Sequence, residues 1–222
     1  MTDHIVKSFD DELTFLGEHV LKMGARVSDH LSLAIDAVAR HDLSQAENVK
    51  QRDAIIDKME HEIYESAVKT LALRHPVAKD LRTVIGALKI SSDLERMGDH
   101  ATNIARRVRD LQDAELSAQL SALLRLHDRV QQMLAEVLVA YRDFSHEKAT
   151  YVWHMDRDVD NMYASYFREL LTYMMADPRH IDVATQLLFM AKNIERAGDH
   201  VKNIAEMIYY IATGTYFVPP SA

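Results

Sequence analysis

The chain has 222 residues, of which 34 are acidic and 26 are basic, so its formal net charge at pH 7 is −8. This length suits one domain or two small ones, and the lack of cysteine excludes disulfides, thiolate metal sites and a cysteine nucleophile. The acidic balance argues against nucleic acid as a partner. No apolar run approaches the ~18 residues that a membrane-spanning helix needs, so we expect no membrane insertion.

Long stretches without glycine or proline, rich in Ala, Leu, Met, Glu, Lys and Arg, predict an all-α fold of six long antiparallel helices. Asp42 and Ser145 are predicted N-caps, because their side-chain oxygens can accept hydrogen bonds from the free amides of a first turn. Pro76 and Pro178 are expected just inside helix starts, where a missing N–H costs nothing. The expected helices span residues 9–40, 43–74, 77–111, 115–143, 146–176 and 180–212.

The chain also repeats itself. Eleven residues from Glu95 to Ala105 recur from Glu195 to Ala205 at a spacing of 100, with eight identities. Their shared pattern is Glu-Arg-x-Gly-Asp-His-x-x-Asn-Ile-Ala, and an upstream pair of aspartates recurs at a spacing of 103. We therefore predict two tandem, homologous three-helix bundles, with domains at residues 1–112 and 113–222.

Carboxylates interrupt the apolar faces of four of these helices. In the third helix, an apolar stripe that begins with Leu81 and Leu88 runs on into acidic side chains, and the sixth helix repeats this change. In the second and fifth helices, aspartates four residues apart lie within the core face. The interrupting carboxylates are Asp53, Asp57, Glu95, Asp99, Asp156, Asp160, Glu195 and Asp199, with Asn103 and Asn203 one turn further along.

Folding the second and third helices, and the fifth and sixth, as antiparallel hairpins places these carboxylates opposite one another in two groups of four. Converging carboxylates repel each other, and protonation, a neighbouring Arg or Lys, or a bound cation would relieve the repulsion. Most Arg and Lys side chains on these helices point elsewhere on the wheel, so we predict bound metal ions in each bundle. Oxygen ligands suit Mg²⁺, Mn²⁺, Ca²⁺ and iron.

The competing interpretation is a solvent-exposed acidic patch with salt bridges between residues four apart. His100 and His200 also repeat, but they share the side of the wheel that carries Arg and Lys, so we interpret them as surface or capping residues. Glu60 is a further carboxylate on a core face, but its counterpart is Tyr163, so we do not include it among the ligands. Gly98, like its repeat, lies in mid-helix and indicates a close approach of a neighbouring backbone.

The repeated segment, the aspartate pairs and the opening stretch from His4 to Asp10 resemble the PhoU family, the accessory proteins of bacterial phosphate-specific uptake. The resemblance covers nearly the whole chain. It implies two three-helix bundles, a cytoplasmic location, a homodimer, and multinuclear metal sites on the eight carboxylates named above. The cofactors expected from this resemblance are divalent or trivalent metal ions: iron, Mn, Mg or Zn.

The resemblance further implies a regulatory adaptor and not an enzyme. Such an adaptor would link the ATPase subunit of the phosphate ABC transporter to a sensor histidine kinase, and would repress the phosphate-starvation response when phosphate is plentiful. The rival hypothesis is a helical-bundle metalloenzyme or metal-storage protein that uses the same carboxylates.

Overall fold

The computed structural model describes residues 2–111 and 117–219, which form six long α-helices and two short 3₁₀ turns. The helices are α1 Thr2–Arg40, α2 Leu43–Arg74, α3 Ala78–Arg106, α4 Ser117–Asp143, α5 His146–Ala176 and α6 Ile181–Thr213. The 3₁₀ turns are η1 Val108–Leu111 and η2 Pro178–His180. The predicted all-α fold of six long helices is confirmed.

Both predicted N-caps are confirmed. Asp42 Oδ1 accepts a hydrogen bond from the backbone N–H of Gln45 at 2.9 Å, and α2 begins at the predicted residue. Ser145 Oγ accepts from the backbone N–H of Lys148 at 3.2 Å, and α5 also begins where expected. A side-chain oxygen that binds a first-turn amide therefore marks these two helix starts in the sequence itself.

Other helix boundaries differ from the prediction. Helix α1 begins at Thr2 and not at residue 9, because neither glycine nor proline interrupts this stretch. The expected start of the fourth helix, at residue 115, lies outside the described residues. The third helix ends at Arg106, and its last predicted turn is the 3₁₀ turn η1.

The two prolines behave differently. Pro178 opens η2, whose first turn is capped by Asp177, as expected for a proline at a helix start. The same expectation for Pro76 was wrong, because Pro76 lies in the linker between α2 and α3. His75 ends α2 in the left-handed region with φ 49°, and the extended Val77 is the N-cap of α3.

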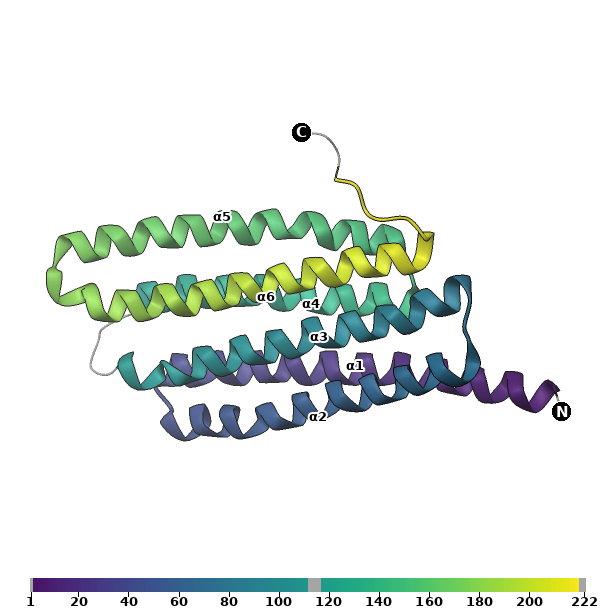
Figure 1. The fold of residues 1–222 in the computed structure, drawn as a ribbon. Helices are drawn as coiled ribbons and strands as arrows, with labels where there is room; N and C mark the ends of the chain where they lie inside the picture. The colour runs from purple at the N-terminus through teal and green to yellow at the C-terminus, as the bar shows by residue number, and fades with distance from the viewer. Residues whose placement is uncertain (1, 112–116, 220–222) are drawn as a thin grey trace.

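The six helices form two three-helix bundles that lie side by side (Figure 1). Helices α1, α2 and α3 pack against one another, and so do α4, α5 and α6. The bundles meet mainly through α3 against α6, and to a lesser extent through α1 against α4, so α2 and α5 lie on opposite outer sides. In the part of the chain that the structure describes, no helix carries an apolar stretch that could cross a membrane.

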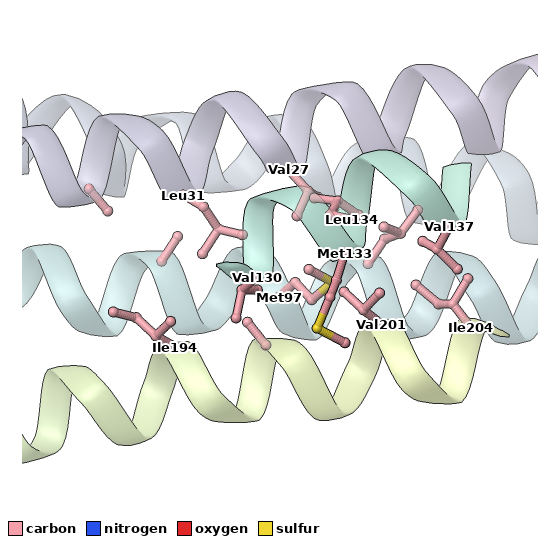
Figure 2. Close-up of a cluster of buried hydrophobic side chains, with 14 of the residues drawn as sticks. Val27, Leu31, Met97, Val130, Met133, Leu134, Val137, Ile194, Val201 and Ile204 are labelled. Carbon is pink, nitrogen blue, oxygen red and sulfur yellow. The ribbon is translucent and has the colours of Figure 1, made fainter. Parts of the chain in front are cut away.

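The hydrophobic core is continuous across the two bundles. Figure 2 shows Val27 of α1 and Met97 of α3 beside Met133 of α4 and Val201 of α6, and all four side chains are fully buried. Away from this shared core, α3 packs against α2 and α6 packs against α5. The two hairpins that carry the predicted carboxylates, α2–α3 and α5–α6, therefore lie on opposite sides of this shared core.

Candidate metal centres

The first group of carboxylates, which we call acidic face 1, consists of Asp53 and Asp57 on α2 and Glu95 and Asp99 on α3. Partial desolvation raises the pKa of Asp57, and the negative charges of Asp53 and Asp99 raise it further. Desolvation likewise raises the pKa of Glu95, with further contributions from Asp99 and Asp57 that outweigh the opposing charge of Arg96. The two helices therefore bring the predicted pairs close enough to repel one another.

Gly98 lets α2 approach α3 closely at this face. A Cβ at Gly98 would lie 3.0 Å from Ile56 Cδ1 and 3.6 Å from Asp53 Oδ1. In the second bundle a Cβ at Gly198 would lie 3.3 Å from Val159 Cγ1. The atoms nearest to both glycines belong to side chains, so the structure shows close side-chain packing there and not the backbone approach predicted from the sequence.

The second group, acidic face 2, consists of Asp156 and Asp160 on α5 and Glu195 and Asp199 on α6. It is more deeply buried, since Asp156 is only 3% exposed and Glu195 only 9% exposed. Desolvation and the charge of Asp156 raise the pKa of Asp160. Desolvation also raises the pKa of Glu195, in spite of its hydrogen bond to Lys192. The second pair of helices thus repeats the convergence of the first.

Two lysines enter acidic face 2, which corrects the expectation that Arg and Lys point elsewhere. Lys202 Nζ donates to Asp156 Oδ2 at 2.5 Å, and Lys192 Nζ donates to Glu195 Oε1 at 2.6 Å. Burial lowers the pKa of Lys202, but the hydrogen bond to Asp156 and the nearby carboxylates outweigh burial and raise it. The wheel missed this arrangement because a lysine stem is long enough to bring its ammonium group round to a neighbouring face.

Neither acidic face is a ready-made metal site. Within residues 2–111 and 117–219, no three His, Asp or Glu side chains are placed so as to share one ion. Asp57, Asp99, Asp160 and Asp199, the outer members of the four pairs, are exposed to solvent. The oxygen donors fit a hard cation in type, but they would have to reorient to bind one.

The two weaker candidates make contacts that lead away from the acidic faces. Asn103 Oδ1 accepts a hydrogen bond from Arg106 Nη1 at 3.3 Å. Asn203 Nδ2 lies 3.5 Å from Asp93 Oδ1, across the boundary between the bundles. The amide of Asn103 therefore binds a side chain of its own helix, and the amide of Asn203 contacts the other bundle.

The repeated histidines lie between the two bundles, and their interpretation as surface residues was wrong. The rings of His100 and His200 stack with their centroids 5.5 Å apart. His100 Nδ1 lies 3.0 Å from Asn193 Oδ1, and His200 Nδ1 lies 2.8 Å from Asp93 Oδ1. Asp93 and Asn193 are themselves 100 residues apart, so the contact has approximate twofold symmetry. Burial lowers the pKa of His100.

His30 of α1 lies beside acidic face 1, and sequence reasoning missed it. Its side chain is 3% exposed, and its Nε2 lies 3.6 Å from Asp53 Oδ1 and 3.2 Å from Thr102 Oγ1. The available signal was its position in an apolar stripe, three residues after Val27 and four before Ala34. A buried polar residue in such a stripe needs a polar partner. Here the partners are Thr102 and the predicted ligand Asp53.

Comparison with known proteins agrees with this architecture. The PhoU domain family model matches residues 20–108 and again residues 123–208. A phosphate-specific transport system accessory protein PhoU homolog of Rhizobium meliloti is 44% identical over 95% of this chain and 90% of its own length. The corresponding homolog of Caulobacter vibrioides is 45% identical over 96% of this chain and 94% of its own length.

Solved structures show the same fold. The crystal structure of PhoU from Pseudomonas aeruginosa is 38% identical in sequence and covers 93% of this chain, with 100% of that structure matched and a TM-score of 0.89. The structure of the phosphate transport system regulatory protein PhoU from Streptococcus pneumoniae is 33% identical, covers 95% of this chain and also has a TM-score of 0.89. Because the family's domain occurs twice and its members match nearly the whole chain, the chain belongs to the PhoU family.

Proposed function

We propose that this protein is a cytoplasmic regulatory adaptor of phosphate homeostasis that acts without enzymatic turnover. It would bind the ATPase subunit of the phosphate transporter and a sensor histidine kinase, as a homodimer, and repress the phosphate-starvation response when phosphate is plentiful. The observation that carries this proposal is the match to phosphate-specific transport accessory proteins over 95% or more of the chain. The family shown by that match is the basis for the accessory role, and the named partners are part of the proposal.

A reporter of the phosphate-starvation response tests the adaptor role. In phosphate-rich medium, a strain that lacks this chain should express the reporter strongly, and the wild-type chain supplied from a plasmid should silence it. A strain that lacks both this chain and the sensor kinase should stay silent, because the signal then has no kinase to pass through. Repression that persists without this chain would contradict the proposal.

We further propose that metal ions neutralise the acidic faces and stiffen the hairpins that carry them. Asp53, Asp57, Glu95 and Asp99 would hold the ions of the first bundle, and Asp156, Asp160, Glu195 and Asp199 are the corresponding donors of the second. The raised pKa values of Asp57 and Glu95 support this, because they reflect desolvation first and then neighbouring negative charge that no basic side chain fully offsets. When bound, the ions would supply positive charge and cross-link α2 to α3.

Elemental analysis of natively purified protein tests the metal proposal. Wild-type protein should carry metal, and the variant in which Glu95, Asp99, Glu195 and Asp199 are all replaced by alanine should carry none. A matched control replaces Glu62, a glutamate of α2 whose side chain is 44% exposed, and should keep its metal. A wild-type protein that stays metal-free even after loading would contradict this part of the proposal and leave the adaptor role untouched.

The rival function, a metalloenzyme or metal-storage protein on the same carboxylates, makes a different prediction. An enzyme needs an open coordination position and a site for its substrate. Phosphatase or ferroxidase turnover by metal-loaded protein, abolished in Asp99→Ala, would favour the rival. Binding to a transporter or kinase subunit without turnover would favour the adaptor.

A further inference from the structure

Four positions that differ between the two repeats surround the acidic faces. They are related by the same spacings of 100 and 103 that relate the carboxylates. The equivalent pairs are Lys192 and Ser92, Lys202 and Thr102, Trp153 and Lys50, and Tyr163 and Glu60. Two of the changes add lysines beside acidic face 2. Another adds the carboxylate of Glu60 beside acidic face 1.

In acidic face 2, Lys202 is held between a carboxylate and an aromatic ring. Its Nζ donates to Asp156 Oδ2 at 2.5 Å and lies 5.0 Å from the centre of the Trp153 ring. Asp156 is almost completely buried, so the ammonium group contacts it where water is largely excluded. The attraction in such a pair is less screened than at an exposed site, and loss of the lysine would leave a buried charge without a partner. The ring face adds a cation–π attraction.

Lys192 is placed in the same way one helix turn from Glu195. Its Nζ donates to Glu195 Oε1 at 2.6 Å and lies 5.3 Å from the centre of the Tyr163 ring. Both lysines come from α6, and both rings come from α5, so the hairpin carries its own two cations. Oδ1 of Asp156 and Oε2 of Glu195 nevertheless have no hydrogen-bond partner among the described residues, although Lys192 Nζ lies 2.5 Å from the latter.

Acidic face 1 has the opposite composition. Glu60 stands in place of a ring and adds a carboxylate whose charge acts on Glu95. Lys50 turns away from the face and pairs with Glu47 at 2.7 Å. Among the described residues, no lysine or arginine forms an ion pair with any carboxylate of this face, where the nearest basic group is the imidazole of His30.

We propose that Lys192 and Lys202 take the place of a metal ion in acidic face 2, so that metal ions bind to acidic face 1 alone. The proposal rests on the proposed metal function and narrows it to one bundle. An ion that entered acidic face 2 would have to displace an ammonium group from a buried carboxylate, which leaves a lysine without its partner. In acidic face 1 an ion would displace no ammonium group.

Binding of Mn²⁺ to full-length protein, measured by equilibrium dialysis, tests the proposal. Asp57→Asn with Asp99→Asn removes the outer carboxylates of acidic face 1 and should weaken binding at least tenfold. The matched variant Asp160→Asn with Asp199→Asn removes the equivalent carboxylates of acidic face 2 and should change binding less than twofold. All four side chains are exposed, so neither variant should disturb folding. Circular dichroism checks this.

Exchange of the lysines for the residues of the first repeat supplies the second test. Lys192→Ser with Lys202→Thr should create Mn²⁺ binding at acidic face 2, which Asp160→Asn with Asp199→Asn then removes. The melting temperature of the metal-free exchange variant should fall, and Mn²⁺ should restore it. If the double exchange does not fold, Lys192→Ser alone, at a side chain that is 41% exposed, provides the same comparison.

The outcomes separate this inference from the proposed function on which it rests. Equal loss of Mn²⁺ binding in the two matched variants would overturn the inference and leave the metal proposal intact. A lysine-exchange variant that folds but binds no additional Mn²⁺ would also overturn the inference and leave the metal proposal intact. Wild-type protein that binds no Mn²⁺ at either face, and that also stays metal-free by elemental analysis after loading, would overturn both.

Discussion

Glu95 and Glu195 occupy equivalent places in the two repeats, yet their surroundings differ. Glu195 is 9% exposed and receives a hydrogen bond from Lys192. Glu95 has carboxylates as its nearest charged neighbours, apart from Arg96, and no ion pair within the described residues. One residue type in one sequence motif therefore has a hydrogen-bonded partner in one bundle and mainly repulsive neighbours in the other. The difference depends on position 192 and its equivalent, which lie outside the shared motif.

The pKa of Glu95 leads to a pH-dependent prediction. Because its folded-state pKa lies above the ordinary 4.5, the folded chain binds this proton more tightly than the unfolded chain does. The resulting stabilisation is present below pH 4.5 and is lost as the pH rises through the folded-state pKa. Glu95→Gln should therefore raise the free energy of unfolding of metal-free protein at pH 7, by roughly 0.5–1 kcal/mol for a partly exposed group.

Thermal melts of Glu95→Gln and wild type in chelator, from pH 7 down to pH 4.5, measure this difference. It should shrink as the pH falls, because the wild-type carboxyl then becomes neutral as well. Glu62→Gln, at a half-exposed site on α2, should show no such trend. A Glu95→Gln variant that is less stable than wild type at pH 7 would contradict the explanation.

At the scale of single helices, the start of α2 depends on one side chain. Asp42→Ala removes the acceptor for the backbone N–H of Gln45, and we expect it to lower the free energy of unfolding by about 1 kcal/mol. Asp42→Asn keeps an oxygen in the same place and should retain most of the stability. Denaturant unfolding of the three proteins measures the effect, and an equal loss in both variants would point to lost charge in place of lost capping.

Two helix glycines should respond to alanine in opposite directions. An added Cβ at Gly17 of α1 meets no atom within 4 Å, so Gly17→Ala should raise the free energy of unfolding by about 0.5–1 kcal/mol through helix propensity. An added Cβ at Gly86 of α3 would lie 2.9 Å from Cγ1 of the buried Ile211 of α6. Gly86→Ala should therefore lower the free energy of unfolding by about 1–3 kcal/mol. Denaturant unfolding decides both signs.

At the scale of the whole molecule, the two bundles share one hydrophobic core. Val27 and Met97 of the first bundle are buried in a layer that also contains Met133 and Val201 of the second. The stacked rings of His100 and His200 and their hydrogen bonds lie along the same boundary between α3 and α6. A three-helix unit therefore does not bury its own apolar surface completely.

This shared core predicts that half of the chain is not stable alone. Residues 1–112, expressed without the rest, should aggregate or melt at lower temperature than the full chain, because the face that normally meets α4 and α6 is then exposed. Co-expression of residues 113–222 should restore a soluble complex. A monomeric fragment as stable as the full chain would contradict this reading of the core. The predicted domain boundary at 112 lies outside the described residues and stays a prediction.

The sequence by itself determined the six helices, the caps at Asp42 and Ser145, the duplication and the facing carboxylate pairs. These features depend on helix periodicity, on hydrogen bonds within one turn and on residues that recur at a fixed spacing. The position of Pro76 could not be predicted from its neighbours in the sequence, because proline is equally suitable in a linker and in the first turn of a helix.

Only the tertiary structure decided what stands opposite each helix face. A helical wheel gives the direction of His100 from its own axis, but it does not reveal that a second bundle covers that side. It also does not show that the flexible stems of Lys192 and Lys202 carry their ammonium groups onto Glu195 and Asp156. The charge of each acidic face is therefore a property of packed neighbours, because electrostatic interactions depend on distances that the order of residues along the chain does not specify.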